Sequence, residues 1–209
     1  MAKSTKIQER REREKQEMHD KIVQAAREMF LEEGYEKVSI RKIAERIAYS
    51  PGTIYNYFDN KDELLHAVHE QGFEELYDLL NASMSIADPL ARLQAMGQSY
   101  WQFAMDNPDD YDLMFLVRAP MHAEKNLDSW DCGFMTFGVL HQTVEDLQAS
   151  GRMKDHDAHA LTFVIWSAVH GMVSLFIRER LKMYPEEMQA HIGQAGLASL
   201  LSMIRGYDS

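Results

Sequence analysis

The chain has 209 residues, 45% of them hydrophobic, and a formal net charge of −11 at pH 7. This content supports a packed core in one large domain or two modest ones, and no run of about 18 apolar residues indicates a membrane span. The single cysteine, Cys132, excludes an intramolecular disulfide and fits a reducing compartment. Since the charged first residues also lack the apolar stretch of a signal peptide, we expect a cytoplasmic protein without a membrane partner.

The negative charge is confined to the second part of the chain. Residues 1–66 carry 13 basic and 13 acidic side chains, whereas residues 67–209 carry 9 basic and 20 acidic ones. Between Lys37 and Lys61 the basic side chains outnumber the acidic ones. A basic patch on one small module is enough for docking on nucleic acid, even in an acidic protein.

Residues 1–20 are almost entirely polar, with basic and acidic side chains interleaved. Such a segment cannot bury one face, so it forms either a frayed arm or a solvated helical extension. An arm could touch phosphates or the minor groove, as homeodomain arms do. The interleaved acidic residues favour a solvated tail instead.

From Lys21 onward, apolar residues recur at helical spacing and predict an amphipathic helix. Gly34 follows as a C-cap, and Ser39 is the candidate N-cap of a second, short helix. A brief turn then leads to Ser50 and Pro51, a cap candidate followed by proline at the first helical position.

This third helix is expected to run to about Phe58. Asn60, with Glu63 three residues later, resembles a capping box and predicts the start of a fourth helix. Three short helices with a tight turn between the second and third indicate a helix-turn-helix.

The remaining sequence predicts helices throughout, separated by proline and glycine. We expect them near 61–83, 89–106, 109–118, 128–149, 156–182 and 186–206. The predicted fold is therefore all-α, with an N-terminal three-helix helix-turn-helix domain followed by a larger helical domain. The expected boundaries are 1–20 for the charged arm or helix extension, 21–66 for the DNA-binding domain and 67–209 for the larger domain.

An ordered set of residues carries a family resemblance over more than forty positions. The set comprises Ile22-Val23-Gln24-Ala25-Ala26, Phe30, Gly34-Tyr35, Ser39-Ile40, Ile43-Ala44, Ser50-Pro51-Gly52-Thr53-Ile54-Tyr55-Asn56-Tyr57-Phe58, Asn60-Lys61 and Leu64-Leu65. Its order and spacing resemble the TetR family of transcriptional regulators. One departure is Ala48, where the family usually has glycine; alanine there is strained if the turn needs a positive φ.

The resemblance implies that the third helix enters the major groove of DNA. Gly52 and Thr53 have little bulk, and Pro51 and the Thr53 methyl group can pack on a thymine methyl. The counterparts of Tyr55, Tyr57 and Lys61 grip phosphates in the family. The candidate DNA-binding residues are Ser39, Arg41, Lys42, Ser50, Pro51, Gly52, Thr53, Tyr55, Asn56, Tyr57 and Lys61.

The two tyrosines have an alternative role as core aromatics of a small domain. Ile54 and Phe58 are one helical turn apart and define the inward face. Tyr55 and Tyr57 are two residues apart, so they cannot both share that face, which favours a DNA role for Tyr55 in particular.

The second part of the chain is rich in methionine and aromatic residues, which usually form plain core but can also repack around apolar ligands. Its Trp166-x-x-x-His170-Gly171 run resembles a C-terminal domain type of part of the family. His170 either bonds a polar group of a ligand or packs under Trp166 as a core histidine. The candidate ligand-binding residues are Trp101, Phe115, Trp130, Phe134, Phe137, Trp166 and His170.

The resemblance also implies that the larger helical domain is a ligand-binding and dimerisation domain, with a homodimer formed through the last two helices. These helices carry small residues, and Gly171 in mid-helix predicts a close approach of another helix. A two-fold dimer binds a palindromic operator of double-stranded DNA. A small apolar or amphipathic effector would then make the protein a ligand-responsive repressor.

Metal and catalytic sites are not expected. His156 and His159 share one helix start with Asp155, which is better explained as an N-cap, and zinc prefers three or four ligands on rigid elements. No catalytic set, phosphate-binding loop or cofactor motif is present. The alternative hypothesis is a helical small-molecule-binding protein, or an enzyme using His170 or the histidine pair, whose DNA module is not used.

Overall fold

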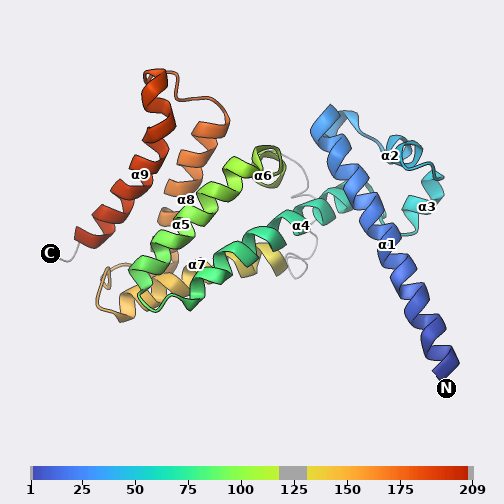
Figure 1. The fold of residues 1–209 in the computed structure, drawn as a ribbon, viewed down its shortest axis with the longest axis horizontal. Coiled ribbons are helices and arrows are strands. Elements are labelled where there is room, and N and C mark those ends of the chain that lie inside the picture. The colour runs from blue at the N-terminus through green and yellow to red at the C-terminus, as the bar shows by residue number, and fades with distance from the viewer. Residues whose placement is uncertain (1, 118–130, 207–209) are drawn as a thin grey trace. The chain divides into compact units, whose positions relative to one another are not determined.

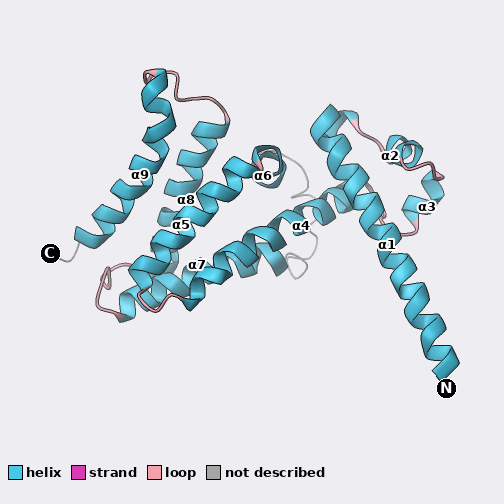
Figure 2. Cartoon of the chain, in the orientation of Figure 1, coloured by secondary structure: helices cyan, strands magenta, loops and turns pink. Residues whose placement is uncertain are grey.

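Every regular element is a helix in the part of the chain that this computed structural model describes, residues 2–117 and 131–206 (Figure 1, Figure 2). The predicted all-α class is therefore confirmed. In chain order the elements are α1 (Ala2–Glu33), η1 (Tyr35–Lys37), α2 (Ile40–Arg46), α3 (Pro51–Tyr55), α4 (Lys61–Ala82), η2 (Ser83–Ser85), α5 (Pro89–Asp106), α6 (Pro108–Phe115), α7 (Asp131–Ala149), α8 (Ala158–Ile177) and α9 (Glu186–Gly206).

The helices form two compact units. Unit 1 contains the chain up to Gly72 together with the segment that starts at Asp109, so it holds α1, α2, α3, the first part of α4, and α6. Unit 2 contains the rest of α4 together with α5, α7, α8 and α9. Helix α6 thus belongs to the helix-turn-helix unit, although α5 and α7, its neighbours in sequence, do not.

Unit 1 is built around one apolar core. Ile22, Ile43 and Ile54 are fully buried on α1, α2 and α3, and Phe58 is 4% exposed. Helix α3 ends at Tyr55, before the expected Phe58, but the backbone N–H of Phe58 still donates to the Ile54 carbonyl at 3.0 Å. The shorter helix therefore keeps both apolar side chains on the inward face.

Local capping interactions set the ends of these short helices. The Ser39 Oγ accepts from the Lys42 N–H, and the Ser50 Oγ accepts from the Thr53 N–H, each at 3.3 Å. At the start of α4 the Asn60 Oδ1 accepts from the Glu63 N–H at 2.9 Å. The predicted caps are confirmed, because each depends only on residues within one helical turn.

The charged segment before Lys21 is helical, so of the two conformations considered for it the structure shows the extension. Helix α1 runs without interruption from Ala2 to Glu33. Arg10 and Glu14 form an exposed ion pair at 2.7 Å, one turn apart. Such pairs stabilise a solvated helix modestly.

The turn between α2 and α3 contains a strained residue. Ala48 has a φ of 60°, a left-handed conformation that costs an L-residue about 1–2 kcal/mol. We expect Ala48→Gly to raise the free energy of unfolding by about 0.5–1 kcal/mol, since glycine relieves this strain but gains freedom in the unfolded chain. Urea unfolding followed by circular dichroism measures the difference.

The reverse exchange at Gly34 is the matched control. Gly34 has a φ of 84°, and a Cβ added there would meet no described residue within 4 Å. Gly34→Ala should therefore lower the free energy of unfolding by about 1 kcal/mol through the backbone alone. A neutral or destabilising Ala48→Gly would show that the turn is not strained.

A buried histidine makes unit 1 sensitive to acid. His69 of α4 is 6% exposed, and within the described residues its Nε2 has no hydrogen-bond partner. Burial lowers the pKa of His69 to about 4; a hydrogen bond with the Leu113 backbone opposes this, and the nearby His66 adds to it. The unfolded chain takes up this proton near pH 6.5, so stability is full above pH 6.5 and is lost as the pH falls towards 4.

We expect this group to remove about 2 kcal/mol of unfolding free energy between pH 7.5 and pH 5. Urea unfolding at the two pH values measures the loss, and His69→Leu should abolish most of it. His156→Gln, at an exposed position, should leave the pH dependence unchanged. An unaltered pH dependence in His69→Leu would mean that another group carries it.

Unit 2 has its own apolar core between α5, α7 and α8. Leu93, Val144, Leu147 and Ile165 are among its buried residues. The Asp157 side chain caps α8 by accepting from the Ala160 N–H at 2.8 Å, so the cap predicted at Asp155 is wrong.

The C-terminal end of α8 also differs from the prediction. The helix ends at Ile177 rather than near residue 182. Glu179 has a φ of 51°, and the Arg180 N–H donates to the Leu175 carbonyl at 2.8 Å. This left-handed residue closes the helix although the apolar pattern continues beyond it.

A Cβ at Gly171 would meet nothing within 4 Å among the described residues of the single chain, so the close helix approach predicted there is not made within one protomer and remains a prediction for the dimer. The close contact joins α5 to α9 instead. A Cβ at Gly193 would overlap the Trp101 ring, and a Cβ at Gly97 would lie 2.9 Å from the Leu197 side chain. The two glycines therefore allow α5 and α9 to pack tightly.

Candidate nucleic-acid interface and ligand site

Helix α3 presents a small, exposed face above a buried one. Ile54 is fully buried, whereas Tyr55 is 55% exposed and Gly52 is also exposed. A Cβ at Gly52 would meet only the Ser50 Oγ, at an ordinary 3.6 Å. No described residue other than Ser50 and the neighbouring residues of the helix lies within 4 Å of this Cβ position, so the backbone at Gly52 can approach a ligand closely.

Two hydroxyl groups fix the N-terminus of α3. The Ser50 Oγ, which caps the helix, also lies 3.1 Å from the Thr53 Oγ1. This contact orients the Thr53 side chain, which is half-buried, while Asn56 at the other end of the helix is exposed. The arrangement presents a threonine and an asparagine from one short helix.

The basic residues of α2 differ in how they are engaged. The Lys42 Nζ lies 2.6 Å from the Glu33 carboxylate, and an Arg46 guanidinium nitrogen lies 2.7 Å from that of Glu32. Arg41 is exposed and makes no ion pair with any residue that the structure describes. Of these three cations, Arg41 alone can meet a phosphate without first leaving a carboxylate.

Lys61 and Tyr57 have contacts within unit 1. The Lys61 Nζ donates to the Tyr35 carbonyl at 2.9 Å and lies 3.9 Å from the centre of the Tyr35 ring. The Tyr35 hydroxyl donates to Asp62, and burial together with this carboxylate raises the tyrosine pKa. Tyr57 is half-buried against the core. Both DNA-contact candidates therefore also help to hold the start of α4.

The DNA-contact candidates on α2, on α3 and in the adjoining turns all belong to unit 1. One neighbour was missed by sequence reasoning: Tyr49 is 41% exposed in the turn, and the Lys21 Nζ lies 4.9 Å from its ring centre. A tyrosine directly before the Ser50 cap was the available signal. Contact of these residues with DNA remains a prediction.

The ligand-site candidates are not gathered at one place. Phe115 belongs to unit 1, where its ring lies 4.8 Å from that of Tyr111. Trp130 lies outside the described residues. Phe134 is 53% exposed on α7. The remaining members of the set are Trp101, Phe137, Trp166 and His170, all in unit 2.

In unit 2, both ring nitrogens of His170 have polar side-chain partners. The His170 Nδ1 lies 3.1 Å from the Tyr100 hydroxyl, and its Nε2 lies 3.4 Å from the Ser174 Oγ. The Trp166 ring centre lies 5.7 Å from that of the histidine. Burial lowers the pKa of His170. These contacts match the core histidine packed near Trp166, with polar partners from the protein itself, and a bond from His170 to a ligand remains a prediction.

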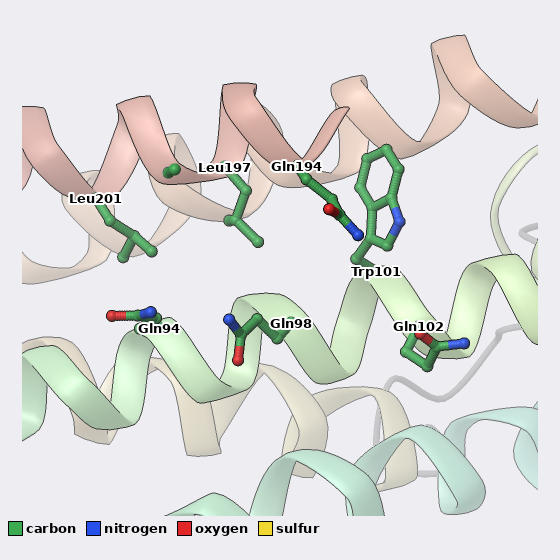
Figure 3. Close-up of a pocket in the computed structure, with 8 residues that line it drawn as sticks. Gln94, Gln98, Trp101, Gln102, Gln194, Leu197 and Leu201 are labelled. Atoms are coloured by element: carbon green, nitrogen blue, oxygen red, sulfur yellow. The ribbon is translucent and has the colours of Figure 1, made fainter. Parts of the chain in front are cut away.

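A groove of about 350 Å³ lies between α5 and α9 of unit 2 (Figure 3). Trp101 forms part of its wall and Leu197 faces it from α9. Uncharged amides line much of the rest: Gln94, Gln98 and Gln102 of α5, and Gln194 of α9. Among the described ligand-site candidates, Trp101 alone lies on this groove.

No group of three or more histidine, cysteine, aspartate or glutamate side chains suited to a metal ion occurs among the described residues. His159 stacks on His141, with ring centres 4.1 Å apart and planes nearly parallel. Stacked rings do not direct their nitrogen lone pairs to one point. The arrangement therefore offers no preformed metal site.

Both parts of the chain match models of known protein families. Residues 22–68 match the family model described as bacterial regulatory proteins, tetR family, and residues 93–200 match the tetracyclin repressor-like C-terminal domain. The chain is 24% identical over 143 residues to the transposon Tn10 TetC protein of Escherichia coli, a match that covers 68% of this chain and 72% of TetC.

Two solved structures illustrate the shared fold. FadR of Bacillus subtilis, solved in complex with stearoyl-CoA, has a TM-score of 0.70 at 18% identity and covers 87% of this chain and 97% of its own. PfmR of Thermus thermophilus, a TetR family transcriptional regulator, has a TM-score of 0.65 at 19% identity and covers 88% of this chain and 97% of its own.

Proposed function

The chain belongs to the TetR family of bacterial regulatory proteins and is a DNA-binding transcriptional regulator, and we propose that it is a ligand-responsive repressor that binds a two-fold-symmetric operator as a homodimer. In this proposal residues 21–66 bind DNA and residues 67–209 bind the effector and form the dimer. The protein acts in the cytoplasm.

The observation that carries the DNA-binding proposal is the exposed first turn of α3. Gly52 and Thr53 approach base edges in the major groove, where the first residues of a recognition helix make contact. Tyr55 and Arg41 bind phosphates, which fix the register on the duplex. Lys42 and Lys61 exchange their internal partners for phosphates when DNA arrives.

The dimer proposal is supported by an exposed apolar face on α8. Phe163 and Val164 are 58% and 57% exposed, and Met203 of α9 is 66% exposed. By length and composition alone α8 could cross a membrane, with a mean hydropathy of 1.9, and 28% of that window is buried. Such a face fits burial against a second copy of the chain, and the free space at Gly171 leaves room for the partner helix.

The effector site is proposed around Tyr100, His170 and Ser174. A polar group of the ligand would compete with Tyr100 and Ser174 for a hydrogen bond to the histidine. FadR, which shares the fold, is bound to stearoyl-CoA in its solved structure, so acyl-CoA is a first ligand class to screen. An effector shifts operator binding only through its different affinity for the two states of the protein, typically by about 1–3 kcal/mol.

Helix α6 is the proposed link between effector and DNA. The Arg27 guanidinium of α1 forms a two-bond ion pair with Asp110 of α6, with its Nε 2.6 Å from the Asp110 Oδ1. This pair ties α6 to the helix-turn-helix within unit 1. Helix α5, which carries Tyr100, leads into α6 through Asn107, and in this proposal the connection passes a change around the effector to a helix that is fixed to α1.

Selection of binding sites from random duplex DNA with the purified chain tests the proposed function. We expect an enriched motif with two-fold symmetry, and an affinity that falls as salt rises with a log–log slope of about −0.9 for each phosphate neutralised. Weak, salt-sensitive binding without enrichment would contradict operator recognition. No binding at all would contradict a role on DNA.

A further inference from the structure

The first turns of α1 lie outside the core of unit 1 and still form a helix. The described side chains from Lys6 to Glu17 are all exposed. Figure 1 shows this stretch continuing α1 as one helix beyond α3, within the same unit. The extension therefore contributes no side chain to the hydrophobic core. Its charged side chains are what a binding partner would contact.

The extension leaves the core directly beside the recognition helix. The His19 ring lies 5.1 Å from the ring of Phe58, which follows α3. The Lys21 Nζ lies 4.9 Å from the ring centre of Tyr49, which precedes α3. These two contacts lie on either side of α3 in sequence. DNA bound to α3 would therefore pass close to His19 and Lys21, where the extension begins.

One face of the extension continues the stripe that packs on the helix-turn-helix. Arg11, Lys15, Met18 and Ile22 follow the spacing i, i+4, i+7 and i+11, which places them on one side of a helix. Ile22 is fully buried in the core and Met18 packs against it. Arg11 and Lys15 therefore project on the same side as the helix-turn-helix, beyond its edge.

The cations of the extension differ in their pairing. Arg10 lies 2.7 Å from Glu14 and Arg13 lies 3.6 Å from Glu17, so both are neutralised one turn away. Arg11 and Lys15 are one turn from each other and make no ion pair among the described residues. Like charges at this spacing weaken a helix, which an anion bound between them would reverse.

We propose that Arg11 and Lys15 bind DNA phosphates that flank the half-site read by α3. This inference rests on the proposed function, because it needs DNA on α3. At 1.5 Å per residue, Arg11 lies about 15 Å along the axis from Lys21, a distance equal to about four base pairs. The contact adds affinity and fixes position on the duplex, and it reads no bases.

The test compares two variants that lose the same charge. Arg11→Gln/Lys15→Gln removes the proposed contact, and Arg10→Gln/Arg13→Gln removes two neighbouring cations from the other faces. The affinity of both variants is measured for the motif that the parent chain selects from random duplex DNA. One duplex carries about 20 additional base pairs on each side of the motif, and the other ends at the motif. Circular dichroism checks that the helix content is unchanged.

On the flanked duplex we expect Arg11→Gln/Lys15→Gln to bind about tenfold more weakly, with a salt slope smaller by about 1.8 per protomer. On the trimmed duplex it should bind like the parent, and Arg10→Gln/Arg13→Gln should bind like the parent on both. Equal losses in the two variants, or no loss in either, would overturn the inference. Failure of the parent to select any motif would instead contradict the proposed function itself.

Discussion

We expect Arg92→Ala to lower the free energy of unfolding by about 3 kcal/mol. Arg92 is 7% exposed on α5; its NH1 lies 2.5 Å from the Asp146 Oδ2 of α7, and its Nε donates to the Ile86 carbonyl at 2.9 Å. The guanidinium also holds the pKa of Asp146 below its ordinary value. Breaking a buried pair from one side costs about 3–5 kcal/mol, and the lower end applies because Asp146 is 38% exposed.

Urea unfolding at one fixed protomer concentration measures this loss, since the proposed dimer would make stability depend on concentration. Arg180→Ala, at an exposed position after α8, is the control and should change the free energy by less than about 0.5 kcal/mol. A loss below about 1 kcal/mol in Arg92→Ala would show that solvent replaces the guanidinium at both acceptors. The α5–α7 contact would then depend on apolar packing alone.

The features predicted correctly from sequence are those decided within one helical turn. Ser39 and Ser50 cap the helices that follow them because an N-cap needs only its own side chain and an N–H three residues on. Pro51 at the first position of α3 and Gly34 after α1 were also predictable, because each depends only on the backbone conformation at that one position. The family's usual glycine at position 48 was the signal for a positive φ there, and Ala48 adopts it.

The two ends of α8 were predicted less well, because the sequence offers more than one residue at which the helix could begin or end. Asp155 and Asp157 are equally good caps by residue type, and the register of the helix on its core selects Asp157. At the other end, apolar residues continue past Ile177, but the left-handed Glu179 ends the helix. Periodicity predicts that a helix exists more reliably than where it stops.

The surroundings of the proposed ligand-site residues were the least predictable part, because they depend on contacts between distant residues. Tyr100 approaches His170 from another helix, and nothing in the sequence around either residue indicates this pairing. Phe115 was grouped with Trp166 by residue type, yet the two belong to different units. Residue type groups aromatic side chains together but cannot say which of them share one space.

We expect Gly52→Leu to weaken binding to the selected operator about 100-fold, equivalent to about 2.7 kcal/mol. Gly52 lies in the first turn of α3, the part of a recognition helix that contacts base edges. A Cβ there meets only the Ser50 Oγ at 3.6 Å, so the leucine side chain extends away from the unit and into the groove. Leucine is also a better helix former than glycine by about 0.8 kcal/mol, so lost folding cannot explain lost binding.

Gly138→Leu provides the matched control on α7. Gly138 is exposed, and a Cβ there would meet nothing within 4 Å of the described chain, so the same exchange in unit 2 should leave operator affinity within about twofold of the parent. Fluorescence anisotropy on the selected duplex and on a scrambled duplex separates specific from general binding. Because phosphate contacts remain in Gly52→Leu, its affinity for the scrambled duplex should change little. Unchanged operator affinity in Gly52→Leu would mean that the first turn of α3 stays outside the major groove, and sequence reading would then have to come from Arg41 and the turn around Tyr49.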